Sequence, residues 1–314
     1  MPRQTLTPPH SAPSHNPAPH CHSAPCAHPA PDTHPAPDAP AQHPASLTVL
    51  TVRPASGLSG DMLLSGLAAL LDLDAPALDA LTDELRLPAL HGVLRLEARQ
   101  VNGIAGVGCH IDLPHEHSHR SLADILALLD VSALPADAAT LAREAFTVLA
   151  AAEGAVHGKS PEQVTFHEVG ALDSILDICL ACRLFTQLAP HRFVCSPLPL
   201  ADGLVRCAHG CLPTPAPAVL HMLEGVAVQG FAGQGETVTP TALCLLKAFK
   251  ADFGPWPAMT VRKTRISYGD NGLPQAVYDA AGRKLTLTFV SVRLDRAGDG
   301  FEPDSEAGVF RAED

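Results

Sequence analysis

The stretch LTVLTVRPASGLSGDMLLSGLAALL, residues 47–71, decides the fold class of this 314-residue chain. Its first six residues, all apolar or β-branched, predict a short buried strand, and the glycines at 57 and 60 predict a sharp turn. The apolar residues that follow predict a helix from Asp61 to about Leu71. A strand, a glycine turn and a helix in direct succession indicate a fold that contains both helices and strands.

The rest of the chain continues this alternation, with hairpins between the helices. Val93–Val101 and Ile104–Leu113 alternate as two strands around the hairpin signal Asn102-Gly103. The expected class is a mixed α/β (α+β) fold, with helices and short strands around a mixed sheet. Further helices are expected at 75–85, 122–129, 136–156, 173–188, 216–223 and 241–249, and further strands at 193–198 and within 259–294.

Both ends of the chain lack these patterns. Residues 1–45 are rich in Pro, Ala and His without helical or strand periodicity, which is typical of a disordered tail. Its Cys and His residues are candidate metal ligands, and a compositional bias without function is the equal alternative. We therefore expect a folded domain over 46–295 and a frayed tail over 296–314.

Charge and cysteine usage restrict the function. The net charge of −12 argues against a nucleic-acid or anionic-membrane partner, because a phosphate backbone needs a basic surface. The nine cysteines are scattered and do not resemble a disulfide framework. Since neither a secretory signal nor an apolar stretch of transmembrane length is found, we expect a reduced, cytoplasmic compartment and no membrane partner.

The turn Gly57-Leu58-Ser59-Gly60-Asp61-Met62 is the first candidate ligand site. A helix that begins after a glycine turn presents free amide groups to an anion. Asp61 can bind a cation beside that anion, or it can cap the helix in a purely structural turn.

Histidines dominate the segment Cys109 to Arg120. His115, His117 and His119 have a spacing of two, so an extended chain projects them to one side, where they can converge on one metal ion. Imidazole suits nickel, zinc and copper alike. A solvated loop that happens to contain histidines is the alternative.

A block of His and carboxylates, Phe166 to Asp177, forms the third candidate. Asp173 and Asp177 are four residues apart and share one helix face. His167 and Glu168 come just before the helix, so the four side chains can form a cation site. The structural alternative makes Asp173 an N-cap and lets Asp177 interact with the helix dipole.

Two further blocks precede helices. His209 and Cys211, in His209 to Pro217, could ligate a metal, as could Cys207, or the block could be a rigid turn. Thr239 is expected to cap the next helix, with Pro240 at its first position. Hydroxyl groups at that helix start, including Thr241, can also bind a phosphate or carboxylate.

Together these blocks resemble the LarC family, the pyridinium-3,5-bisthiocarboxylic acid mononucleotide nickel insertion proteins. The blocks G-L-S-G-D-M, H-S-H-R-S-L-A-D-I, F-H-E-V-G-A-L-D-S-I-L-D, H-G-C-L-P-T-P-A-P-A and E-T-V-T-P-T occur in the family's order over about Thr48 to Gly269. The resemblance implies insertion of nickel into the cofactor of lactate racemase. This reaction is a cyclometallation of the chelatase (lyase) type that converts CTP to CMP and pyrophosphate with manganese or magnesium.

The resemblance also implies partners. These are the pyridinium mononucleotide and a separate C-terminal LarC half, and a homo-oligomer stays an open alternative.

From the resemblance we infer three groups of site residues. They are the catalytic residues Asp61, His167, Glu168 and Asp173; the cofactor-binding residues Ser59, Gly60, Thr239 and Thr241; and the metal-binding residues His115, His117, His119, Asp177, His209 and Cys211.

The chain departs from the family in two places. Ala242 stands where a glycine is expected after T-P-T, and no segment after Ser267-Tyr268-Gly269 resembles the family's C-terminal, nucleotide-associated domain. CTP binding by this chain alone is therefore open, and a split enzyme is one interpretation. A non-catalytic nickel-binding, storage or chaperone protein is the second hypothesis. A metal-dependent hydrolase built on Asp61, His167, Glu168 and Asp173 is the third.

Overall fold

A mixed seven-stranded sheet organises the described part of the chain. The computed structural model describes residues 48–101, 103–113, 120–166, 169–207 and 209–269, and the backbone of 289–294, all within the unit Pro44–Asp314. In spatial order the strands are β11 (Asp252–Phe253), β6 (Arg192–Cys195), β1 (Val49–Pro54), β13 (Phe289–Leu294), β12 (Val261–Ser267), β3 (Ile104–Ile111) and β2 (Leu94–Val101). The strands β11, β6 and β1 run parallel, whereas β13 is antiparallel to both β1 and β12.

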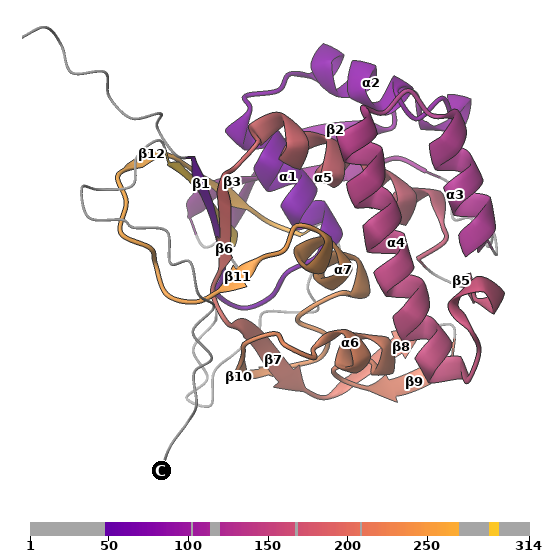
Figure 1. Cartoon of the computed structure of the whole chain (residues 1–314). Helices are drawn as coiled ribbons and strands as arrows, with labels where there is room; N and C mark the ends of the chain where they lie inside the picture. Colours follow the sequence, from indigo (N-terminus) through magenta and orange to yellow (C-terminus); the bar gives the residue numbers. More distant parts are fainter. Residues whose placement is uncertain are drawn as a thin grey trace, which may run out of the picture. The chain divides into compact units, whose positions relative to one another are not determined.

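Helices rich in Leu and Ala pack on this sheet and on one another. The helices are α1 (Gly60–Leu70), α2 (Ala75–Asp83), α3 (Leu122–Val131), α4 (Ala136–His157), α5 (Leu172–Leu188), α6 (Pro217–Met222) and α7 (Pro240–Ala248), with 3₁₀ turns η1 (Pro88–Leu90) and η2 (Pro161–Gln163). Helix α1 lies against β3, β12 and β13 and also against α5, while α4 packs along α5 and α7 (Figure 1). Alanines of α4 at positions 138, 142 and 145 are fully buried, which lets its neighbours approach closely.

Three two-stranded sheets complete the described structure. Strands β7 (Leu198–Asp202) and β10 (Val228–Gln234) are parallel. The pairs β4 (Arg120–Ser121) with β5 (Thr165–Phe166), and β8 (Leu204–Cys207) with β9 (Gly210–Pro213), are antiparallel. No helix in the described ranges is long and apolar enough to cross a membrane.

The mixed α/β class predicted from the sequence is confirmed. The single strand predicted at 193–198 is wrong, because the chain leaves the large sheet after Cys195 and starts β7 in another sheet at Leu198. Pro197, which has no N–H to donate, separates the two strands. The sequence reading also missed the short strands β4, β5, β8, β9, β10 and β11. The predicted tails, 1–45 and 296–314, lie outside the described residues.

Candidate functional site

The loop between β1 and α1 pairs with the segment that leads into α7. Leu58 donates its backbone N–H to the carbonyl oxygen of Thr237 at 2.8 Å, and Thr239 donates to the carbonyl oxygen of Leu58 at 3.1 Å. A Cβ at residue 57 would come within 2.5 Å of the Thr237 carbonyl oxygen, so this approach requires glycine. The pairing places the N termini of α1 and α7 side by side.

A carboxylate and a hydroxyl group meet at the start of α1. A Cβ at residue 60 would lie 2.9 Å from Oδ2 of Asp177 and 3.0 Å from Oγ1 of Thr241. The hydroxyl groups of Thr239 and Thr241 are 2.9 Å apart. Three blocks that are far apart in the sequence therefore converge at Gly60, from α1, α5 and α7.

Ser59 and Asp61 form the second part of this site. Ser59, in extended backbone, is the N-cap of α1, and its hydroxyl group donates to the Asp61 carboxylate. The interpretation of Asp61 as the cap is therefore wrong, because it lies inside the first helical turn. Gly269 approaches from the end of β12, where a Cβ would be 3.5 Å from Ser59 Oγ and 3.6 Å from Asp61 Oδ2.

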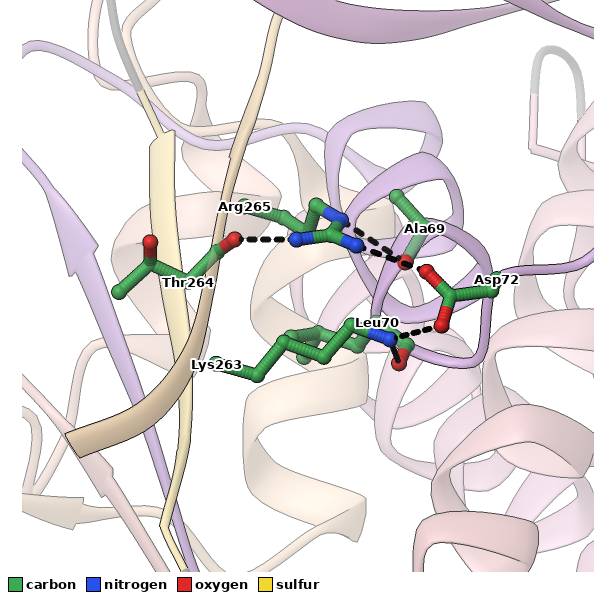
Figure 2. A network of polar contacts seen from close by, with 6 residues as sticks. All are labelled: Ala69, Leu70, Asp72, Lys263, Thr264 and Arg265. Atoms are coloured by element: carbon green, nitrogen blue, oxygen red, sulfur yellow. Dashed lines mark hydrogen bonds and ion pairs between the residues drawn. The ribbon is translucent and has the colours of Figure 1, made fainter.

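Helix α1 is held in this position by β12, which runs beside it. Near the site, Ser267 donates its hydroxyl to the carbonyl oxygen of Met62 at 2.8 Å. At the other end of α1, Lys263 and Arg265 both contact the carboxylate of Asp72, as Figure 2 shows. The same two side chains donate to the last carbonyl groups of the helix, Leu70 at 2.6 Å and Ala69 at 3.1 Å. Cations at a helix C terminus satisfy its free carbonyls and stabilise its dipole.

The cap of α7 follows the sequence prediction. Thr239 is its N-cap and accepts the N–H of Ala242 at 3.3 Å, with Pro240 at the first helical position. Both expectations are confirmed. Thr241 is 9% exposed.

Asp173 and Asp177 have different surroundings although they are one turn apart on α5. The N-cap of α5 is Ala171, so the alternative that made Asp173 the cap is wrong. Asp173 lies in the first turn, is exposed and accepts the N–H of Ser174 at 2.6 Å. Of the two carboxylates, the structure brings Asp177 to Gly60.

Five of the predicted residues cannot be placed. His115, His117, His119, His167 and Glu168 lie outside the described residues. The short strands that adjoin these two stretches in the sequence, β4 and β5, pair with each other. Arg120 of β4 donates to the carbonyl oxygen of Gly170 at 2.7 Å, which ties the start of α3 to the segment before α5.

His209 lies in the turn of the β8–β9 hairpin, and its ring contacts, in a tilted arrangement, the ring of a histidine that the sequence did not predict. Its ring centroid is 4.9 Å from that of His157, the last residue of α4. The Nε2 atom of His157 is 3.5 Å from Oε2 of Glu153, one helical turn earlier. The i, i+4 spacing of Glu153 and His157 is a sequence signal for the contact between these two side chains. Nothing in the sequence spacing predicts the contact of His157 with His209.

The cysteines of the hairpin do not face each other. Cys207 pairs with Gly210, and Cys211 pairs with Arg206. Because directly opposite residues share a face and neighbours alternate, Cys207 and Cys211 project from opposite faces of the hairpin. Cys211 is exposed, so it is the thiol of this pair that is accessible.

The buried thiols of the helical core are poor metal ligands. Burial raises the pKa of the Cys179 thiol to about 12 and that of Cys182 well above its ordinary value. Metal ligation requires the thiolate, which burial disfavours here. Within the described ranges, no group of three or more His, Cys, Asp and Glu side chains is placed to hold a metal ion.

The site therefore defines a mixed α/β protein with oxygen groups at two adjacent helix N termini. The chain belongs to the nickel insertion protein family, since the family model described as nickel insertion protein matches residues 50–278. A pyridinium-3,5-bisthiocarboxylic acid mononucleotide nickel insertion protein of Staphylococcus epidermidis is 37% identical over 214 residues, which are 68% of this chain and 53% of that protein. A Desulfitobacterium hafniense protein of the same name is 40% identical over 220 residues, 68% of this chain and 52% of that protein.

The chain spans about half the length of the curated relatives it matches. No solved structure matches it at a significant level.

Proposed function

We propose that this chain takes part in the insertion of nickel into pyridinium-3,5-bisthiocarboxylic acid mononucleotide. The names of the relatives support this substrate. The observation that carries the proposal is the convergence of Gly60, Asp177 and Thr241, because it joins three of the sequence blocks that resemble the family. The finer parts are also proposals: the product serves lactate racemase, the reaction is a CTP-dependent cyclometallation of the chelatase (lyase) type, and the compartment is cytoplasmic.

The two helix N termini suit the anionic end of the substrate. A mononucleotide phosphate needs amide and hydroxyl donors, which the starts of α1 and α7 and the hydroxyls of Ser59, Thr239 and Thr241 supply. The net charge of −12 repels an anion at long range. Binding must therefore rely on such local donors.

The carboxylates suit a hard divalent cation. Asp61 and Asp177 offer oxygen atoms beside this phosphate site, and Mg²⁺ and Mn²⁺ prefer oxygen ligands. A cation held there would neutralise phosphate groups of CTP. Asp61, His167, Glu168 and Asp173 stay the proposed catalytic residues.

Nickel itself is the cargo, and its proposed ligands are borderline donors. His209 lies in the hairpin turn and Cys211 in the strand beside it, and His157, whose ring contacts that of His209, is an additional candidate. His115, His117 and His119 complete the proposed set together with Asp177. A separate C-terminal half as partner, and a homo-oligomer, are part of the same proposal.

A nickel-transfer assay tests the proposal. The purified chain is mixed with nickel, the metal-free mononucleotide, CTP and manganese, and product is followed by the absorbance of the nickel complex. Asp177→Asn should lower the rate at least tenfold, whereas Asp137→Asn should not, since Asp137 is an exposed carboxylate in the first turn of α4 that accepts the N–H of Ala138.

The arms of this assay separate the alternatives. Product from the chain alone supports an insertase whose CTP site lies within these residues. Product only after addition of a family C-terminal half supports a split enzyme. Bound nickel without product in either arm would contradict insertion and support a storage or chaperone protein.

A further inference from the structure

Thr51 and Arg53 lie on the face of strand β1 that points away from the main hydrophobic core. Leu50 and Val52 pack into that core, whereas Val49 packs with Val194 and Met259 in a separate small cluster. Because side chains alternate along a strand, Thr51 and Arg53 share the face of Val49. In Figure 1 the segment between β11 and β12 lies on the other side of β1 and β6 from α4 and α5.

Three polar atoms on this face are buried and have no hydrogen-bond partner among the described residues. They are Oγ1 of Thr51 and the Nε and Nη2 atoms of Arg53. Thr51 is 0% exposed. Buried polar groups are nearly always paired, so three orphans on adjacent same-face positions of one strand call for an explanation.

The orphan nitrogens form one edge of the guanidinium group. Nη1 already donates to the carbonyl oxygen of Gly254 at 2.6 Å. Nε and Nη2 lie on the opposite edge, whose two N–H groups are parallel and fit the two oxygens of a carboxylate or phosphate. The side chain is thus fixed at one nitrogen, with its bidentate edge unused.

Trp256 holds the guanidinium group in place. Its ring centroid is 4.6 Å from Cζ of Arg53, a cation–π distance, and the indole is 52% exposed. Burial also lowers the pKa of Arg53, which reflects the cost of a partly desolvated cation. An anion at the free edge would offset that cost.

We propose that Arg53, Thr51 and Trp256 form an oxyanion-binding site on this face of the sheet, for a small molecule that carries a carboxylate or phosphate group. Two oxygens of the ligand accept from Nε and Nη2 of Arg53, and the Thr51 hydroxyl donates to the same anion. The half-exposed Trp256 keeps its cation–π contact with the guanidinium group and so holds the free edge in place for the ligand. The proposal does not depend on nickel insertion, since it uses none of the residues around Gly60.

Isothermal titration calorimetry of the full chain with two probes tests it. Inorganic phosphate and pyridine-3,5-dicarboxylate are titrated separately, and the probe whose binding depends on Arg53 identifies the oxyanion. Arg53→Gln and Arg53→Lys should each weaken that binding by about tenfold or more, because both lose the bidentate edge. Thr51→Val, which keeps the shape of the side chain, should weaken it by roughly three- to tenfold.

Arg192→Gln is the matched control. Arg192 lies on the neighbouring strand β6, and its Nε pairs with Asp252 at 2.9 Å. This variant should bind the probe as the unchanged chain does. No saturable binding of either probe, or equal affinity in the unchanged chain and in a folded Arg53→Lys variant, would overturn the proposal. Circular dichroism and urea unfolding establish that each variant is folded.

Discussion

The guanidinium group of Arg99 in β2 reaches the carbonyl oxygen of Gly269 beyond the end of β12, at 2.5 Å from Nη1. On its way it passes over Gly108 of β3, where a Cβ would overlap the Arg99 side chain. Nη2 also donates to the carbonyl oxygen of Cys109 at 3.0 Å. Arg99 thereby holds Gly269 next to Ser59 and Asp61, on the edge of the candidate site.

Gly108→Ala should loosen this edge of the site. The added methyl group displaces Arg99 and should lower the free energy of unfolding by about 1–3 kcal/mol, as overpacking does. Release of Gly269 should also raise the exchange rate of the Tyr268 amide, which donates to Val107 at 2.7 Å. Urea unfolding and hydrogen exchange measure the two effects. Gly254→Ala is the control, because a Cβ at residue 254 meets no atom within 4 Å. A Cβ at Gly92 also meets no atom, but φ of +69° at that residue would strain an alanine.

Gly60→Ala should impair nickel insertion more than it impairs folding. Its Cβ would press on Oδ2 of Asp177 and Oγ1 of Thr241, so the carboxylate and hydroxyl must separate. We expect a rate loss of at least tenfold, and a stability loss of about 1–3 kcal/mol because the contacted atoms belong to side chains. The transfer assay and urea unfolding measure both.

Gly230→Ala in β10 is the control for that substitution. A Cβ at residue 230 meets nothing within 4 Å, so rate and stability should stay close to those of the unchanged chain. An unchanged rate in a folded Gly60→Ala variant would remove this contact from the proposed site.

Local signals predicted most of the helices. The Thr239-Pro240 start of α7 follows from capping preference alone, and the structure has this cap. The Leu- and Ala-rich stretches gave α1, α4 and α5 to within one or two residues. The two-residue strands β4 and β5 were missed because so short a segment has no periodicity to detect.

The arrangement of the site depends on contacts that sequence spacing does not reveal. The spacing of four residues predicts that Asp173 and Asp177 share one face of α5, but it does not distinguish them. Tertiary packing alone decides that Asp177 is the one that lies beside Gly60. His157 was missed because its partner His209 is far away in the sequence, and the two rings meet only where the hairpin turn lies at the end of α4. The exposure of Cys211 likewise depends on the hairpin, not on its spacing from His209.

Asp72 should make the stability of the chain depend on pH. Hydrogen bonds from Lys263 and then Arg265 lower the pKa of its carboxyl group in the folded state (Figure 2). Its contribution is therefore fully present above the unfolded carboxyl pKa of about 4 and is lost as pH falls through the lower, folded-state value. Asp72→Asn should reduce stability at pH 7 and flatten its decline below pH about 4.

Asparagine is the conservative choice here because residue 72 has φ of +53°, a left-handed conformation that Asn tolerates. Asp112→Asn serves as the control, because Asp112 is exposed and its carboxylate pairs with no Lys or Arg side chain in the described part of the chain. Urea unfolding at pH 3 to 7 gives the comparison. Parallel pH curves for the unchanged chain and Asp72→Asn would show that the ion pairs contribute nothing.

Thiol reactivity should distinguish the hairpin from the core. Cys211 is exposed and Cys207 is half-buried, whereas Cys109, Cys179, Cys182, Cys195 and Cys244 are buried. Burial raises the pKa of Cys195 to about 12 and also raises that of Cys244, so these thiols lack the reactive thiolate at neutral pH.

The measurement uses a Cys21→Ser, Cys26→Ser background and a disulfide reagent at pH 7.5, which is about one unit below an ordinary thiol pKa. The reagent should modify Cys211 first. Cys211→Ser should abolish this fast phase, and Cys207→Ser should leave it intact. If nickel slows the modification of Cys211 in this background, the thiol contributes to the metal site. Fast modification of a core cysteine in the same folded background would contradict the packing described here.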